Sequence, residues 1–130
     1  MDITHSPFEN FLKMYVAEKG KDFCKIGLSH RKDLTNPHGI FHGGVIASIA
    51  DTAAVQSLHI LYPTGGPYFT VSLSITYKNP TSAKEIFAEA RSRHLRSKFF
   101  KTDVTITDSD NKLIAQAEVK SFLPNYKQDK

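Results

Sequence analysis

The pattern of apolar and polar residues predicts two helices in the N-terminal half of the chain and strands in the C-terminal half. Ser6 and Pro7 favour a helix start, because serine is a common N-cap and proline is tolerated in the first turn. Gly20 favours the end of this helix. The apolar residues between them recur at helical spacing: Phe8, Phe11, Leu12 and Tyr15.

Residues 43–59 form the most apolar segment and predict a second, longer helix. Apolar side chains surround most of its circumference, which is typical of a buried central helix. They are Val45, Ile46, Ile49, Ala50, Ala53, Ala54 and Leu58. A strand over residues 22–30 and a polar loop over residues 31–38 come before this helix.

After the second helix the pattern changes to period two. Val71, Leu73, Ile75 and Tyr77 alternate with polar residues, which predicts a strand. Further strands are predicted over residues 85–94, 99–107 and 113–122, and a turn rich in aspartate and asparagine over residues 108–111 joins the last two. We expect these four strands to form a meander.

These elements predict an α+β domain over residues 1–130, with a short helix followed by a long central helix against a five-stranded antiparallel sheet. One sheet covers only one side of a helix. A helix that is apolar nearly all round therefore indicates a second sheet, and another copy of the chain is its simplest source. We expect a homodimer.

Composition narrows the class of protein. With 130 residues, 40% hydrophobic and 23% charged, the chain resembles an ordinary globular domain. The single cysteine, Cys24, excludes an internal disulfide, fits a reducing compartment and is expected to be an inert core residue. The first residues carry charges and a proline, so we expect no signal peptide, no transmembrane helix and a cytoplasmic location. The net charge of +4 is scattered, which argues against a nucleic-acid partner.

Gly43 and Gly44 begin the predicted central helix, where the first backbone N–H groups lack helical partners and the helix dipole is positive. Glycines let a ligand oxygen approach these amides closely, as an anion or oxyanion site requires. The pair is also typical of a tight start to a packed helix. Taken alone, it favours this structural interpretation over an anion site.

Asp51 lies in the middle of the same helix, on the face that carries Gly44 and Ser48. It either faces water, bonded to Ser48 or Thr52, or lines a substrate groove where it takes a proton from water. The helix rises roughly 10 Å from Gly44 to Asp51, which is long for one carbonyl to contact both. Two antiparallel copies would bring the aspartate of one chain to the glycines of the other, so we expect a site shared across the dimer.

The motif Asn36-x-x-Gly39-x-x-His42-Gly43-Gly44, followed by Asp51, a strand over residues 71–77 and a proline turn, resembles the hotdog-fold acyl-CoA thioesterases. The similarity is to their PaaI-like (phenylacetate-degradation) branch and extends over nearly the whole chain from about residue 22. It implies a hotdog fold, dimers that are usually paired into tetramers, an acyl-CoA substrate and no metal or organic cofactor.

The resemblance also implies a role for each site residue. Asp51 would be the general base or nucleophile, and the Gly43 amide, with Gly44 beside it, would polarise the thioester carbonyl. Asn36 and His42 would orient this loop, and Ser72 would position water. The basic residues Arg91, Arg93, Arg96 and Lys98 would contact the phosphates of coenzyme A, or are simply solvated charges.

Two other functions compete with hydrolysis, and a zinc site is not expected. A hotdog protein that binds acyl-CoA without turnover would share every motif. A hotdog dehydratase usually pairs a histidine with an acid on one short stretch, and the position of His42 at the helix start counts against it. His38 and His42 have the spacing of zinc ligands, but no third ligand accompanies them.

Overall fold

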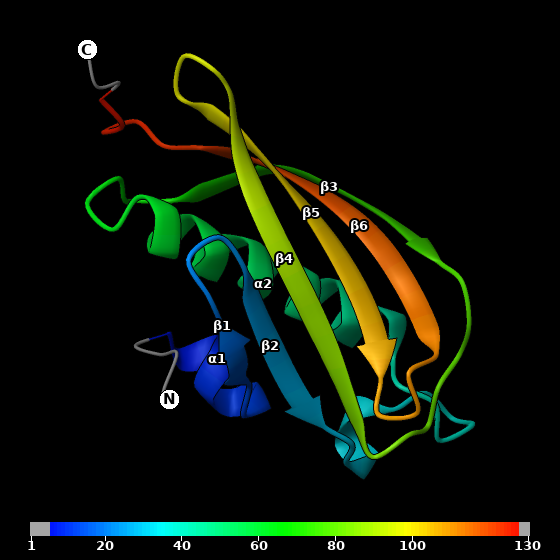
Figure 1. Ribbon diagram of the computed structural model, residues 1–130. Coiled ribbons are helices and arrows are strands. Elements are labelled where there is room, and N and C mark those ends of the chain that lie inside the picture. The colour runs from blue at the N-terminus through cyan, green and yellow to red at the C-terminus, as the bar shows by residue number, and fades with distance from the viewer. Residues whose placement is uncertain (1–5, 128–130) are drawn as a thin grey trace.

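We describe residues 6–127 of a computed structural model of the chain. The helices are α1 (Pro7–Leu12), a short 3₁₀ helix η1 (Lys32–Leu34) and α2 (Gly43–Leu61). The strands are β1 (Tyr15–Lys19), β2 (Cys24–Ser29), β3 (Phe69–Tyr77), β4 (Glu85–Arg96), β5 (Phe99–Asp108) and β6 (Leu113–Phe122). The antiparallel sheet curves around α2, which lies along its concave face (Figure 1).

The sheet has six strands in the order β1-β2-β4-β5-β6-β3, so two predictions about it were wrong. The strand count was one too low because β1 was assigned to a helix. The four C-terminal strands do not form a simple meander, since β3 pairs with β6 and not with β4. As a result β3 is an edge strand (Figure 1).

The first helix begins as predicted, with Ser6 at the N-cap position, but it ends at Leu12 and not near Gly20. Lys13 has a left-handed backbone (φ 62°), which ends the helix, and Tyr15 then pairs with Gly27 on β2. The helical spacing of Tyr15 was therefore misleading. Pairing with a strand that follows it in the sequence decides its conformation.

The core lies between α2 and the sheet. Ile49, Ala50 and Ala53 on α2 are fully buried, as are Ile26 and Ala88 on the strands beneath them. By length and hydropathy α2 is the one helix within residues 6–127 that could also span a membrane, a test that core helices commonly pass. Here its buried face packs on β2, β4 and β5.

The predicted turn between β5 and β6 is confirmed. Asp108 is buried, and its Oδ1 accepts hydrogen bonds from the backbone N–H groups of Asp110 (2.9 Å) and Lys112 (3.0 Å). Its Oδ2 accepts a bond from the Thr81 hydroxyl (2.7 Å). Burial favours the neutral acid, but these donors and the nearby Lys112 charge outweigh it, so the pKa of Asp108 lies below its ordinary value.

Candidate active site

The start of α2 presents a backbone amide with no internal partner. His42 is the N-cap, and its Nδ1 accepts a hydrogen bond from the Gly44 N–H (2.9 Å). The N–H groups of Val45 and Ile46 bond to the His42 carbonyl (3.0 and 3.2 Å). Within residues 6–127 no acceptor faces the N–H of Gly43. This amide, at the positive end of the helix dipole, is therefore available to a ligand oxygen.

The loop before α2 is held in place by Asn36 and by bonds to the rest of the fold. The Asn36 Oδ1 accepts bonds from the N–H groups of His38 (2.8 Å) and Ile40 (3.3 Å). The N–H of Phe41 bonds to the Thr81 carbonyl (3.0 Å). Because the Asn36 oxygen already accepts these two bonds, the NH₂ group is the part of the side chain that could contact a ligand, as a donor.

Asn36 and Gly43 share one hollow, which also contains Tyr77. This hollow has a volume of about 320 Å³. The Tyr77 hydroxyl donates a hydrogen bond to the Gly43 carbonyl (2.7 Å), so β3 supports the first turn of α2. The role of Tyr77 was not predicted, although its place at the end of the alternating apolar positions was a usable signal.

Asp51 lies in a second hollow, beside a residue that the sequence analysis did not single out. The Thr70 hydroxyl donates a hydrogen bond to Asp51 Oδ1 (2.6 Å). The groove around this pair has a volume of about 460 Å³, and its lining from α2 and β3 includes Ala47, Ser48 and Leu73. The half-buried carboxylate is thus oriented by Thr70 and faces an open groove.

Ser72 is not brought to Asp51. Ser72 pairs with the exposed Lys120, whereas Thr70 pairs with the buried Ser121. The register shifts between Thr70 and Ser72, and this irregularity changes which alternate residues face the helix. Within one chain, Thr70 and not Ser72 therefore contacts the Asp51 carboxylate, and a role for Ser72 in positioning water stays a prediction.

Within one chain the two hollows share no lining residue. One carries the amide donor Gly43 with Asn36, and the other carries Asp51 with Thr70. This separation agrees with the axial distance between the glycines and the aspartate.

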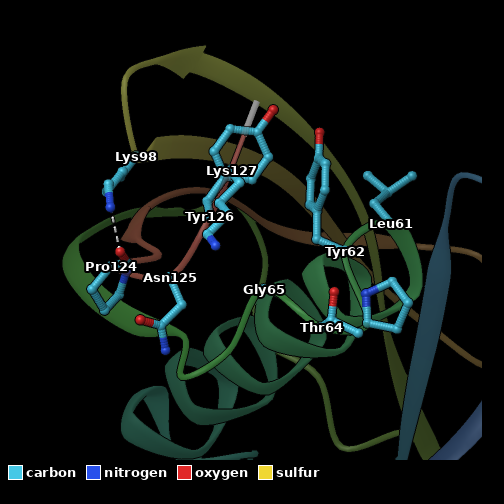
Figure 2. Close-up of a pocket in the computed structure, with 10 residues that line it drawn as sticks. Leu61, Tyr62, Thr64, Gly65, Lys98, Pro124, Asn125, Tyr126 and Lys127 are labelled. Atoms are coloured by element: carbon cyan, nitrogen blue, oxygen red, sulfur yellow. Dashed lines mark hydrogen bonds between the residues drawn. The ribbon is translucent and has the colours of Figure 1, made fainter. Parts of the chain in front are cut away.

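The predicted basic residues do not form a single cluster. Arg96 lines a depression with Val71, Leu95 and Lys120 on the sheet face away from α2, and Arg93 is exposed on the same strand. Lys98 instead lies in a separate pocket of about 970 Å³ near the end of α2, where its Nζ donates to the Pro124 carbonyl (Figure 2). Arg91 pairs with Asp22 and Glu89.

The part of the chain that the structure describes has no group of side chains suited to bind a metal ion. No three side chains of histidine, cysteine, aspartate or glutamate gather there in a way that could hold an ion. Cys24 is buried, and desolvation raises the pKa of its thiol to about 11, which makes it a poor nucleophile and ligand.

Comparison with known proteins identifies the family. The sequence profile of the thioesterase superfamily matches residues 38–115, which include the Gly43 amide, Asp51 and Thr70. Human acyl-coenzyme A thioesterase 13 is 30% identical over 112 residues, covering 84% of this chain and 77% of that protein.

Solved structures agree on the fold. A thioesterase from Haemophilus influenzae superposes with a TM-score of 0.86 at 17% identity, covering 93% of this chain and 85% of its own. The PaaI protein of the E. coli phenylacetic acid degradation operon gives 0.82 at 22% identity, covering 92% and 85%. The chain belongs to the thioesterase superfamily and has its hotdog fold.

Proposed function

We propose that this protein hydrolyses an acyl-CoA thioester to a free acid and coenzyme A. The observation that carries the proposal is the pair formed by Asp51 and Thr70, a carboxylate fixed by a 2.6 Å hydrogen bond in an open groove of a thioesterase-superfamily chain. The name of the human relative supports coenzyme A as the thiol.

In this mechanism the Gly43 N–H of one chain polarises the thioester carbonyl, and it stabilises the oxyanion that forms when the carbonyl carbon is attacked. The Asn36 NH₂ group is a second donor in the same hollow. Asp51 takes the proton of the attacking water, or attacks the carbon itself, and Thr70 holds the carboxylate in position. The sulfur then leaves and receives a proton.

We propose that each site combines Gly43 of one chain with Asp51 of another. The two separate hollows support this arrangement, because each holds half of the chemistry. The edge strand β3 supports it too. It leaves one row of backbone groups unpaired within the described chain, next to both hollows, and such an edge is suited to pairing with a second copy.

The nucleotide end of coenzyme A is assigned to the outer face of the hairpin between β4 and β5. Arg93 and Arg96 are exposed there and carry the charge that phosphates need. Lys98 is a weaker candidate, because its ammonium group already bonds to the Pro124 carbonyl.

The test is thiol release from a panel of acyl-CoAs by wild type, Asp51→Asn and a control, Asp103→Asn, whose carboxylate is exposed on β5. We expect Asp51→Asn to lower kcat by roughly 10²–10⁴-fold, the usual contribution of a general base, and the control to be unaffected. Equal rates for wild type and Asp51→Asn would refute the mechanism. Acyl-CoA binding without thiol release by wild type would indicate a binding protein.

A complementation experiment tests the shared site. Gly43→Pro removes the amide hydrogen at the first helical position, where proline is tolerated, and His42 (φ −62°, ψ 137°) has the backbone that precedes proline. Gly43→Ala keeps the hydrogen and serves as the control. Mixed, refolded Asp51→Asn and Gly43→Pro chains should regain about a quarter of wild-type activity, because random dimers contain one intact site in half of the cases. No recovery would place the whole site in one chain.

A single turnover in H₂¹⁸O tests whether Asp51 is the nucleophile, because the position of the ¹⁸O label depends on its role. If a nucleophilic Asp51 forms an anhydride that is hydrolysed at the Asp51 carbonyl, Asp51 acquires the label and passes its own oxygen to the product acid, which is then unlabelled. A general base, or an anhydride hydrolysed at the acyl carbon, leaves Asp51 unlabelled and the product acid labelled.

A further inference from the structure

The groove that contains Asp51 is lined in part by the start of α1. Ser6, the N-cap, and Phe8 and Glu9 in the first turn line it together with Ala47 on α2 and Leu73 on β3. Phe8 is the largest apolar side chain in the lining, and 55% of its surface is exposed in the described protomer. No part of the proposed hydrolytic chemistry uses this side chain.

The helix is firmly fixed in this position. Arg31, from the segment after β2, donates from Nη1 to the Leu12 carbonyl (2.7 Å) and from Nη2 to the Phe11 carbonyl (3.1 Å). These are carbonyls at the C-terminal end of α1, which a helix leaves unsatisfied and a cation stabilises. Leu12 and Met14 are buried in the core and anchor the same end. The position of Phe8 over the groove is therefore built into the fold.

The chemistry at Asp51 limits what can occupy this groove. If Asp51 acts on the thioester carbon, the acyl group attached to that carbon must lie within a few ångströms of the carboxylate. Ala47 has a small side chain and Leu73 is fixed on β3, so neither residue changes the volume of the groove much. Phe8 is the bulkiest apolar residue of the same lining, so its ring is the group whose size most affects the room that remains.

We propose that Phe8 is the wall of the acyl pocket and sets the size of the acyl group that the enzyme accepts. This inference rests on the proposed thioester hydrolysis and adds its substrate class, an uncharged, mainly apolar acyl group. Glu9 and Asp51 line the same groove, and two carboxylates there repel an acyl group that ends in a carboxylate of its own.

The test compares kcat/KM for acyl-CoAs from acetyl to dodecanoyl, and for phenylacetyl-CoA, in Phe8→Ala, Phe8→Trp and wild type. Removing the ring should move the optimum to larger acyl groups, and the indole should move it to smaller ones. A change of this kind in an apolar pocket alters selectivity by roughly 10–200-fold. Succinyl-CoA should be a poor substrate for all three.

Phe11→Ala is the matched control. Phe11 belongs to the same helix, is 70% exposed and does not line the groove, so its removal should leave the acyl profile unchanged. If Phe8→Ala fails to fold, Phe8→Leu replaces it and should shift the optimum in the same direction by a smaller factor. Equal changes for all acyl groups, or the same shift in Phe11→Ala, would overturn the inference.

Asp51→Asn in the same panel separates the two proposals. If Asp51→Asn abolishes thiol release while the Phe8 variants keep the wild-type acyl profile, the proposed hydrolysis is supported and the role of Phe8 as the pocket wall is refuted. If Asp51→Asn remains fully active, the proposed mechanism fails, whatever the Phe8 profile shows.

Discussion

Asp108 is a buried carboxylate at the end of β5, and it holds both the following turn and Thr81. Asp108→Ala removes the acceptor of three hydrogen bonds. The buried Thr81 hydroxyl would keep the hydrogen bond that its oxygen accepts from the Ala83 N–H (3.0 Å), but its own hydrogen would lose its acceptor. The N–H groups of Asp110 and Lys112 lie in a surface turn that water can reach. With 1–3 kcal/mol for the buried hydrogen left without an acceptor and a smaller loss in the turn, we expect destabilisation of about 3 kcal/mol.

The pH dependence of Asp108→Asn provides the sharper measurement. The folded-state pKa of Asp108 is lowered, so its contribution to stability is complete above the unfolded-state pKa of about 3.9 and is lost as the pH falls through the folded-state value. Urea unfolding of wild type and Asp108→Asn, followed from pH 7 downwards, should show a stability difference that shrinks with acid. A difference that is absent at pH 7, or that grows with acid, would refute this account of the turn.

Two further predictions concern residues of β2. Gly27→Ala should lower the free energy of unfolding by about 1–3 kcal/mol, measured by thermal or urea denaturation. An added Cβ would lie 2.4 Å from Cζ of the Tyr15 ring, and this ring cannot move away easily because its hydroxyl bonds to Glu85. Unchanged stability would mean that the ring moves freely. Cys24 should react with a thiol reagent at pH 8 only as fast as the protein unfolds, because the side chain is buried and the pKa of its thiol is raised to about 11. Rapid labelling of the folded protein would contradict its place in the core.

Local pattern predicted the elements whose conformation depends on their own residues. The central helix begins at Gly43 as expected, because the glycine pair and the apolar positions after it agree. The alternation of residues 71–77 predicted β3 for the same reason. By contrast, Tyr15–Lys19 has no strong pattern of its own and becomes a strand by pairing with β2. The place of β3 beside β6 also depends on contacts distant in sequence.

The residues of the candidate site also differ in how far their own sequence pattern could predict them. Asp51 stood out because a carboxylate is unusual on an apolar helix, and the structure places it in an open groove. Thr70 could not be distinguished from Ser72 by alternation, since the irregularity at the start of β3 reverses which residues face α2. The wall formed by Phe8 was equally hidden, because Arg31 fixes α1 from a distant part of the chain.

The hydrogen bond between His42 and Gly44 determines where the imidazole carries its proton. A backbone N–H can only donate, so Nδ1 must offer its lone pair, and the neutral ring then bears hydrogen on Nε2. Toward a ligand His42 is therefore a donor, suited to an oxygen or to a departing sulfur. A dehydratase that used Nε2 as its base would need the opposite tautomer and would lose the cap of α2. The cap of the central helix therefore counts against a dehydratase mechanism with His42 as its base.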